Sequence, residues 1–417
     1  MKRVLISLLL VTAVPLYAER PAEGGASLTL DQAVSLAIRD NARLRSLHAK
    51  TRAMQERPAQ AGALPNPMFT YSGMDLADRG SWPDSGEKRY MLQQEFPWFG
   101  KRALRAEIAG KDAETMQREF DAAAREVVMT VKETYYDLYA TRRVMEITRE
   151  EEAVLQRILK VAETMYSTGS RSQTDAIKAQ TEVTLLKQKM LELQSQENLL
   201  QARLNTLLGR RPDNLLELAA KPPEVAGPEP VHTLFARAAE NRPEILGAQA
   251  QVERYALEQR LMQKDYLPDY KLGLEYRSLR KEDDMLMFTV SVELPIWQSK
   301  YRAGVREAAE MQVYSQAARE AAAQQSSFDV QDAAFKLQTA RRTLELYRTE
   351  LIPQAEARFS ASEAGYRTGK TDFMDLLESE RFLLNAKTMS AMMESTVGMQ
   401  AARLERATGA ALPAEGK

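Results

Sequence analysis

The chain repeats one pattern about 200 residues further on. The run Tyr166-Ser167-Thr168-Gly169 returns as Tyr366-Arg367-Thr368-Gly369, and Asp175 has a counterpart in Asp375 at the same spacing. Three further pairs of matching runs are Ala63-Leu64-Pro65 with Tyr266-Leu267-Pro268, Arg142-Arg143 with Arg341-Arg342, and Leu208-Gly209 with Thr408-Gly409. An open stack of repeats generally needs three or more units, so two copies predict one pseudo-symmetric domain.

The stretch from Lys221 to Pro230 contains four prolines and separates the two copies. Prolines at this density end regular structure, so the stretch predicts a linker. We therefore expect four parts after the N-terminal segment: a first structural repeat over residues 19–220, an inter-repeat linker over 221–232, a second repeat over 233–412, and a tail over 413–417.

The N-terminus has the pattern of a secretory signal. Met1-Lys2-Arg3 precedes an apolar run from Val4 to Val14, and Ala18 ends the segment with a small residue. We expect a signal peptide over residues 1–18, with a buried N-terminal helix as the alternative. The run is too short to cross a bilayer as a helix, and the sequence contains no other long apolar run. The chain is therefore expected to be exported without a helical membrane span.

Composition excludes several partners and kinds of site. The balance of 57 basic and 58 acidic residues argues against a nucleic acid partner. The absence of cysteine excludes disulfides and thiolate metal sites. His48 and His232 have no such ligands beside them, so we expect no metal site there. The sequence shows no paired nucleophile and general base, no phosphate-binding loop and no couple of catalytic carboxylates. We therefore expect that the protein is not an enzyme and binds no cofactor.

Long helices account for most of the chain. No proline occurs between Pro97 and Pro212, which predicts helix interrupted only at the Gly169 turn. The segment from Lys101 to Tyr166 would extend about 100 Å as continuous helix. In the second copy a helix is expected from about Ser299 to Gly365, with a kink or break at Pro353.

The helices that follow the two turns carry apolar stripes at coiled-coil spacing. The stripe in the first copy comprises Leu186, Met190, Leu193, Leu200, Leu204 and Leu207. The stripe in the second copy comprises Phe382, Ala386, Met389, Met393 and Leu404. Each copy therefore predicts a long helical hairpin.

Four segments alternate apolar and polar residues with a period of two, as strands do. The alternation is clearest in two segments, Tyr270 to Arg277 and Leu286 to Leu294. The first copy has weaker equivalents at Phe69 to Tyr71 and Tyr90 to Phe96. Strands of this length can cross an outer membrane when tilted. The edge of a soluble sandwich is the alternative. Aromatic residues at the strand ends, Trp98, Phe99, Tyr266, Tyr270 and Trp297, favour membrane strands.

Membrane strands must close into a barrel, and four strands are too few to close alone. Each chain must then contribute its hairpins to a barrel shared with other copies. Two copies would give eight strands and three would give twelve, the latter wide enough for a lumen. The sequence leaves the number of copies open.

The order of helix, hairpin, long helix, tight turn and returning helix resembles the TolC-like outer-membrane factors of tripartite efflux pumps. The resemblance covers about Leu28 to Leu412. It rests on Leu64-Pro65-Asn66-Pro67, on the run from Gln94 to Arg102 and on the two Tyr-x-Thr-Gly turns. The surroundings of Pro67 and Gly100-Lys101-Arg102 are most similar to members that serve heavy-metal resistance-nodulation-division pumps.

The resemblance implies a mainly α fold with a small β part. Duplicated coiled-coil hairpins would form an α-barrel, and a homotrimer would share a transmembrane β-barrel of twelve strands in outer-membrane lipid. It further implies passive efflux from the periplasm of a Gram-negative bacterium, with a periplasmic adaptor and an inner-membrane resistance-nodulation-division pump as partners. A periplasmic adaptor or a soluble coiled-coil scaffold without a pore is the alternative function.

The two helical turns are the expected periplasmic mouth. Gly169 and Gly369 suit the left-handed conformation that ends a helix, and Ser172 or Thr371 is expected to cap the next helix. Tyr166 and Tyr366 recur three residues before these glycines, and an exposed aromatic at a tip commonly makes a contact. We therefore expect adaptor docking at Tyr166, Gly169, Tyr366 and Gly369.

The resemblance also implies a gate at this mouth. Thr174, Asp175 and Tyr366 match positions that link the tips in related members. A basic partner is expected where Thr371 stands, and the adjacent Lys370 is a candidate substitute. Asp375 and Glu378 match acidic positions that face the lumen, where a threefold ring of carboxylates would attract cations. For Asp375 an ordinary helix start, where acids favour the dipole, is an equal alternative.

Overall fold

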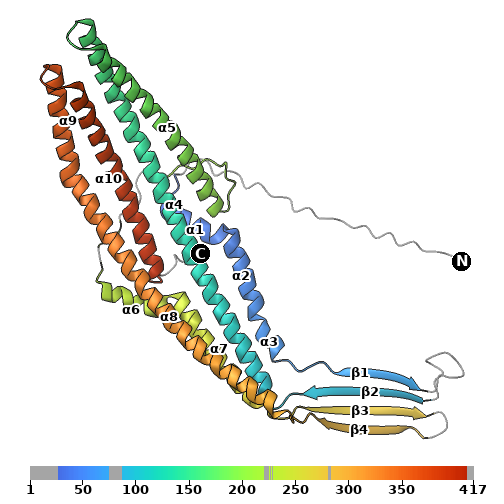
Figure 1. Ribbon diagram of the computed structural model, residues 1–417. Coiled ribbons are helices and arrows are strands. Elements are labelled where there is room, and N and C mark those ends of the chain that lie inside the picture. The colour runs from blue at the N-terminus through green and yellow to red at the C-terminus, as the bar shows by residue number, and fades with distance from the viewer. Residues whose placement is uncertain are drawn as a thin grey trace, which may run out of the picture.

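The computed structural model describes residues 27–74, 87–219, 225, 227, 229–279 and 283–410. These residues form an elongated layer of helices that continues at one end into a small sheet (Figure 1). The expected signal peptide and the 413–417 tail lie outside the described residues, as does half of the expected linker. The mainly helical architecture with a small β part confirms the expected fold class.

The long helices form as the proline pattern predicts. Helix α4, Lys101–Ser167, is one uninterrupted helix of 67 residues, and α5, Gln173–Leu207, returns beside it. In the second copy the chain forms α8, Gln298–Leu346, then the π-helix η2, Tyr347–Leu351, and then α9, Ile352–Arg367. The break expected at Pro353 is therefore a π turn just before that proline. Helix α10, Phe373–Ala407, completes the second hairpin.

Shorter helices precede each hairpin. The first copy begins with α1 (Leu30–Asp40), α2 (Ala42–Gln55) and α3 (Arg57–Ala61). The second begins with α6 (Val231–Asn241) and α7 (Pro243–Lys264). A capping box fixes the start of α1, because the side chains of Thr29 and Gln32 each accept from the backbone N–H of the other.

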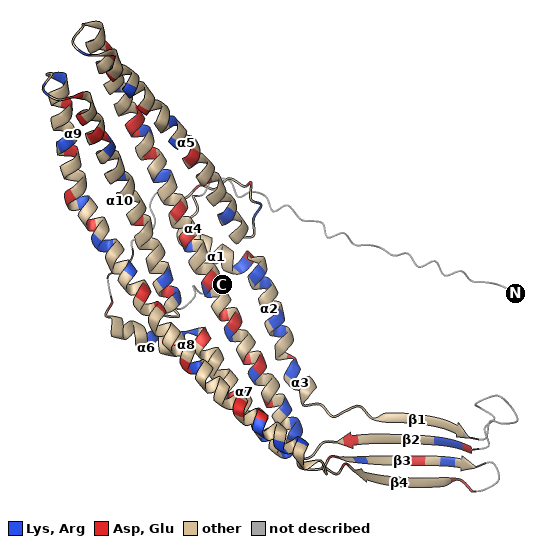
Figure 2. Cartoon of the chain, in the orientation of Figure 1, with Lys and Arg blue, Asp and Glu red and all other residues tan. Residues whose placement is uncertain are grey.

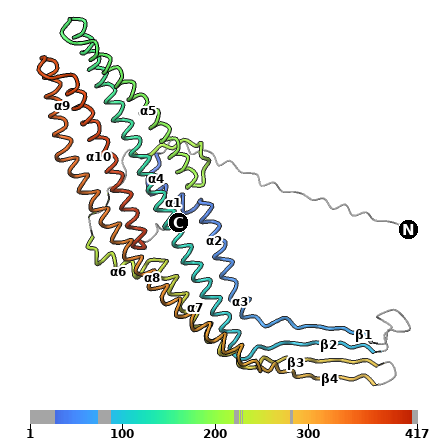
Figure 3. Tube along the Cα trace, viewed as in Figure 1, coloured from blue at the N-terminus to red at the C-terminus, as the bar shows by residue number. Residues whose placement is uncertain are grey.

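The helices lie side by side in one curved layer (Figures 1 and 3). In the half far from the sheet their order across the layer is α9, α10, α4, α5. In the half next to the sheet α2 and α3 pack on α4, and α7 lies between α4 and α8. The long α4 and α8 thus run through both halves. The layer is open, with α5, α2 and α3 along one edge and α8 and α9 along the other.

The sheet is antiparallel, with the strands in chain order. The strands are β1 (Met68–Met74), β2 (Glu87–Phe96), β3 (Tyr270–Leu279) and β4 (Met285–Val292). The predicted alternation is confirmed, since the register pairs apolar with apolar residues, as in Leu92 with Leu274 and Leu274 with Phe288. The opposite face carries ion pairs from Lys271 to Glu95 and from Arg277 to Glu87.

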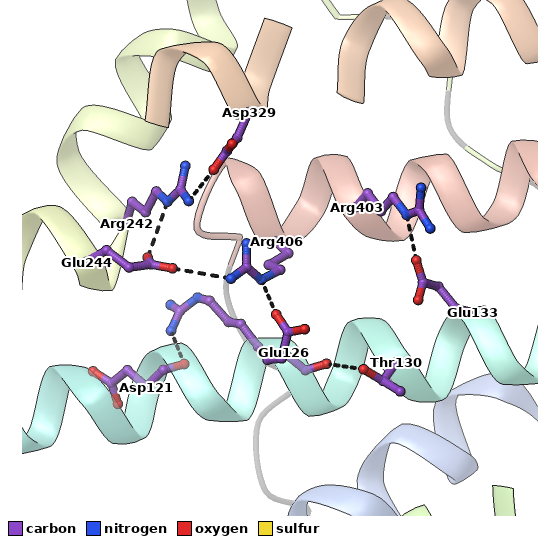
Figure 4. A network of polar contacts seen from close by, with 10 residues as sticks. Asp121, Glu126, Thr130, Glu133, Arg242, Glu244, Asp329, Arg403 and Arg406 are labelled. Atoms are coloured by element: carbon purple, nitrogen blue, oxygen red, sulfur yellow. Dashed lines mark hydrogen bonds and ion pairs between the residues drawn. The ribbon is translucent and has the colours of Figure 1, made fainter. Parts of the chain in front are cut away.

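An ion-pair network ties the two repeats together midway along the molecule (Figure 4). The buried Arg242, just before α7, lies 2.5 Å from Asp329 of α8 and 3.2 Å from Glu244 of α7. Arg406 of α10 bridges Glu244 and Glu126 of α4. Because this network joins α4, α7, α8 and α10, it fixes the second repeat on the long helix of the first.

Close packing of α4 on α10 supports a first prediction. A Cβ atom on Gly398 would lie 2.3 Å from the ring of Tyr136, which is buried in the core formed by α1, α4 and α5. We expect Gly398→Ala to lower the free energy of unfolding by about 1–3 kcal/mol, because the two helices must separate to admit the methyl group. Circular dichroism melts at 222 nm measure the loss. The matched control is Gly110→Ala, where a Cβ meets no atom within 4 Å; an equal loss there would contradict the packing explanation.

Candidate functional site at the helical tips

The two turns far from the sheet have the backbone that the sequence predicts. Gly169 and Gly369 adopt the left-handed conformation, with φ of 72° and 76°. Ser172 caps α5, since its Oγ accepts the Thr174 N–H at 3.2 Å. The prediction that Thr371 caps α10 is wrong. Asp372 is the N-cap and accepts the Phe373 N–H at 2.6 Å, because it occupies the position equivalent to Ser172.

The structure brings two expected gate residues together across the two repeats. The Tyr366 hydroxyl donates a hydrogen bond of 3.3 Å to Oδ2 of Asp175, and both residues are buried. Burial, followed by the neighbouring Asp175 carboxylate, raises the pKa of Tyr366 to about 12. The third expected linking residue, Thr174, is exposed, and its hydroxyl accepts from Ser172 Oγ at 3.1 Å.

Sequence reasoning missed Arg171. Its guanidinium lies over the Tyr366 ring, with Cζ 5.3 Å from the centroid, and Nη2 donates to the carbonyl oxygen of Thr371 at 3.0 Å. The basic residue was expected at Thr371, in the second tip. Aligning the two tips would have found it, because Arg171 and Thr371 are counterparts 200 residues apart. The basic residue of the link therefore lies in the first tip, not in the second.

The two tip tyrosines are not equivalent. Tyr166 is 47 % exposed, as expected for a contact residue, whereas Tyr366 is 1 % exposed. The expectation of an exposed aromatic is therefore wrong for Tyr366. Its ring lies 5.4 Å from that of Phe373 and belongs to an apolar cluster shared by both hairpins. The cluster also contains Leu155, Ile158, Ala162, Ala179, Val183, Leu376 and Leu377.

The acidic residues after the second tip lie in different environments. Asp375 and Glu378 are exposed, and Glu378 lies 3.5 Å from Arg358. Glu380, which the sequence analysis did not single out, is only 1 % exposed and hydrogen-bonds the buried Glu151 of α4. Desolvation, then this hydrogen bond and charge, raises the pKa of Glu380 to about 9. The carboxyl groups of Glu380 and Glu151 thus lie together in the interior between α4 and α10.

Two further properties concern only the part of the chain that the structure describes. None of its helices is both long enough and apolar enough to cross a membrane. Among the same residues, no group of three or more histidine, cysteine, aspartate or glutamate side chains could hold a metal ion.

Comparison with known proteins places these features in a family. A family model described as "Outer membrane efflux protein" matches residues 33–210 and 234–410, one match for each copy. The cobalt-zinc-cadmium resistance protein CzcC of Cupriavidus metallidurans is 21% identical over 380 residues, which are 90% of this chain and 87% of the relative. The pyoverdine export outer membrane protein OpmQ of Pseudomonas putida is 22% identical over 92% of this chain and 86% of its own length.

Solved structures share the fold. The outer-membrane channel OprN superposes with a TM-score of 0.79 at 18% identity, covering 92% of this chain and 90% of that one. CusC superposes with a TM-score of 0.79 at 17% identity, covering 92% of each chain. The duplicated hairpins, the four-stranded sheet and a family match that spans both copies lead to one conclusion: the chain belongs to the outer membrane efflux protein family.

Proposed function

We propose that three copies of this chain form the outer-membrane channel of a tripartite efflux pump, which conducts substrates passively out of the periplasm. The support for an oligomer comes from the edges and the apolar face of the sheet. The sheet ends in two strands without a charged residue, β1 and β4 (Figure 2), and its apolar face is exposed, as at Leu286 and Phe288. Edge strands of single soluble sheets are normally protected by charge or cover. These edges instead suit pairing with other copies in lipid.

The tips would be the periplasmic mouth of this channel. We propose that Tyr166, Gly169 and Gly369 shape the surface that docks a periplasmic adaptor, and that the buried Tyr366 supports this surface from within. The gate would comprise Thr174, Asp175, Tyr366, Asp375 and Glu378. The hydrogen bond from Tyr366 to Asp175 supports a link between tips. Energy would come from an inner-membrane resistance-nodulation-division pump behind the adaptor.

The substrate class that we favour is heavy-metal cations. CzcC is named for cobalt, zinc and cadmium resistance, and it aligns over 90% of this chain. OpmQ is named for pyoverdine export, so a siderophore is the second candidate. Substrate choice in such a pump would reside mainly in the inner-membrane component.

Two measurements test the function. Native mass spectrometry of the mature protein in detergent should give the mass of three chains, and a detergent-independent monomer would contradict the channel. A strain without this chain should retain several-fold more cobalt, zinc or cadmium, and complementation with the intact chain should reverse this. Unchanged metal content together with a retained siderophore would favour the second candidate.

A further inference from the structure

We propose that a groove on the first helical hairpin, α4 and α5, receives the second hairpin, α9 and α10, of a neighbouring copy. In this contact the Tyr166 hydroxyl donates a hydrogen bond to Asp375 of that copy. The inference rests on the proposed homotrimer but adds a specific contact between copies. Two kinds of seam would then surround the mouth: the in-chain seam, between the two hairpins of one chain, and the seam between copies, between hairpins of neighbouring chains. The two kinds would differ in their chemistry.

The groove lies along α4 and α5 of the first hairpin, near its tip. It has a volume of about 490 Å³ and an apolar floor that includes Leu159 and Ala176. Ile177 is largely exposed there, and Tyr166 lines the end next to the turn. The other lining residues are Glu163, Gln173, Gln180, Thr181 and Thr184. An exposed apolar groove on an open helical edge indicates a surface that packs against another hairpin.

The internal duplication identifies the face on which this groove lies. Every lining residue has a counterpart 200 residues further on, and five of these counterparts pack in the cluster that the second hairpin shares with the first. The counterparts of Tyr166, Gln173, Ala176 and Ile177 are Tyr366, Phe373, Leu376 and Leu377, all fully buried in the cluster between the hairpins. The face that carries the groove on the first hairpin is thus equivalent to the face of the second hairpin that is buried within the chain, but it is not covered.

The same comparison identifies what should cover the groove. Within the chain, the first hairpin presents Asp175 to Tyr366, so the second hairpin should present Asp375 to Tyr166 of another copy. Asp375 and Phe382 are exposed on the second hairpin, and Phe382 is the counterpart of Glu182. Both an acceptor for the tyrosine and an aromatic ring for the apolar floor are therefore available. Glu378, which is exposed beside Arg358, is not used by this contact.

Two contacts of the in-chain seam do not recur between copies. Arg171 contacts the Tyr366 ring and the Thr371 carbonyl oxygen within one chain. The residue at the equivalent position of the second tip is Thr371, which has no positive charge to offer Tyr166 of another copy. The in-chain seam also has an ion pair of Arg381 with Glu182. At the equivalent positions of the seam between copies, Thr181 would face Phe382. Near the tips, each in-chain seam therefore has two arginine contacts, and each seam between copies has neither. The seams between copies should separate first when the mouth opens.

The test is cross-linking of a double-cysteine variant, Tyr166→Cys with Asp375→Cys, in the full-length protein. The chain has no cysteine, so there is no background reaction. A contact from a tyrosine hydroxyl to a carboxylate separates the backbones further than a disulfide spans, so a short bismaleimide is the appropriate reagent. We expect bands of two and three chains on a denaturing gel. The matched control, Asp175→Cys with Tyr366→Cys, should cross-link within one chain and leave its mass unchanged.

The outcomes separate this inference from the proposed function. Trimers in detergent whose Tyr166→Cys and Asp375→Cys variant gives no bands above one chain would overturn the contact and leave the channel intact. No trimer at all would contradict the channel itself. Each single-cysteine variant should remain one chain in mass, and bands of two chains from either alone would indicate random collision.

Discussion

Replacing Lys101 with methionine is expected to lower the free energy of unfolding by about 3 kcal/mol, because one buried cation holds the junction of helix and sheet together. Lys101 is 3 % exposed at the start of α4. Its Nζ lies 2.9 Å from Asp269 Oδ1, 2.9 Å from the Leu267 carbonyl oxygen and 3.5 Å from Asp265. Methionine fills the space but leaves these acceptors without their shared donor.

The measurement for Lys101 is a thermal melt of the purified protein in detergent, followed by circular dichroism. The matched control is Lys300→Met, the related lysine of the second copy, which is exposed over the ring of Tyr301 at 5.5 Å. That change should alter stability by no more than about 0.5 kcal/mol. If both variants melt at the same lowered temperature, loss of positive charge in general, and not burial, would be the cause.

Replacing Glu380 with glutamine is expected to stabilise the protein above neutral pH. The folded-state pKa of Glu380 is raised above its ordinary value of 4.5 to about 9. The stability associated with the protonated group is fully present below pH 4.5 and is lost as pH rises toward 9, by at most about 1.4 kcal/mol per pH unit. Glutamine stays neutral and can still donate to Glu151, so it removes this loss.

The readout for Glu380 is the melting temperature at several values between pH 5 and pH 9. The wild type should melt progressively lower as pH rises, and the Glu380→Gln variant should show a flatter profile. Glu378→Gln is the matched control, because Glu378 is exposed two residues away and should leave the profile unchanged. Parallel profiles for the wild type and Glu380→Gln would show that Glu380 is not the titrating group.

Local patterns predicted the elements well. The absence of proline after Pro97 predicted α4, and period-two alternation predicted β3 and β4, because both signals reflect geometry within one element. The antiparallel order of all four strands, in which β2 pairs with β3 across the two copies, needed the structure. No local pattern specifies which hairpin lies beside which.

The site was predicted less well, for a physical reason. Tyr166 and Tyr366 stand in the same Tyr-x-Thr-Gly pattern, yet one is exposed and the other buried, because burial depends on which hairpin lies opposite. Aligning the two tips would have found Arg171, but its contacts could not be predicted, since its target is in the other tip. The buried pair of Glu151 and Glu380 joins two helices whose sequences each read as ordinary charged surface. Tertiary contacts decide all three cases.

The π turn η2 accounts for a difference in length between the two copies. Arg142 and Arg341 are 199 residues apart, whereas Tyr166 and Tyr366 are 200 apart, so the second copy is one residue longer between these points. The turn Tyr347–Leu351 lies in that interval. One extra residue in an α-helix would rotate everything beyond it by about 100°, which would carry Tyr366 away from Asp175. A π turn takes up the residue locally. The two halves could thus diverge in length while their tips stayed in phase.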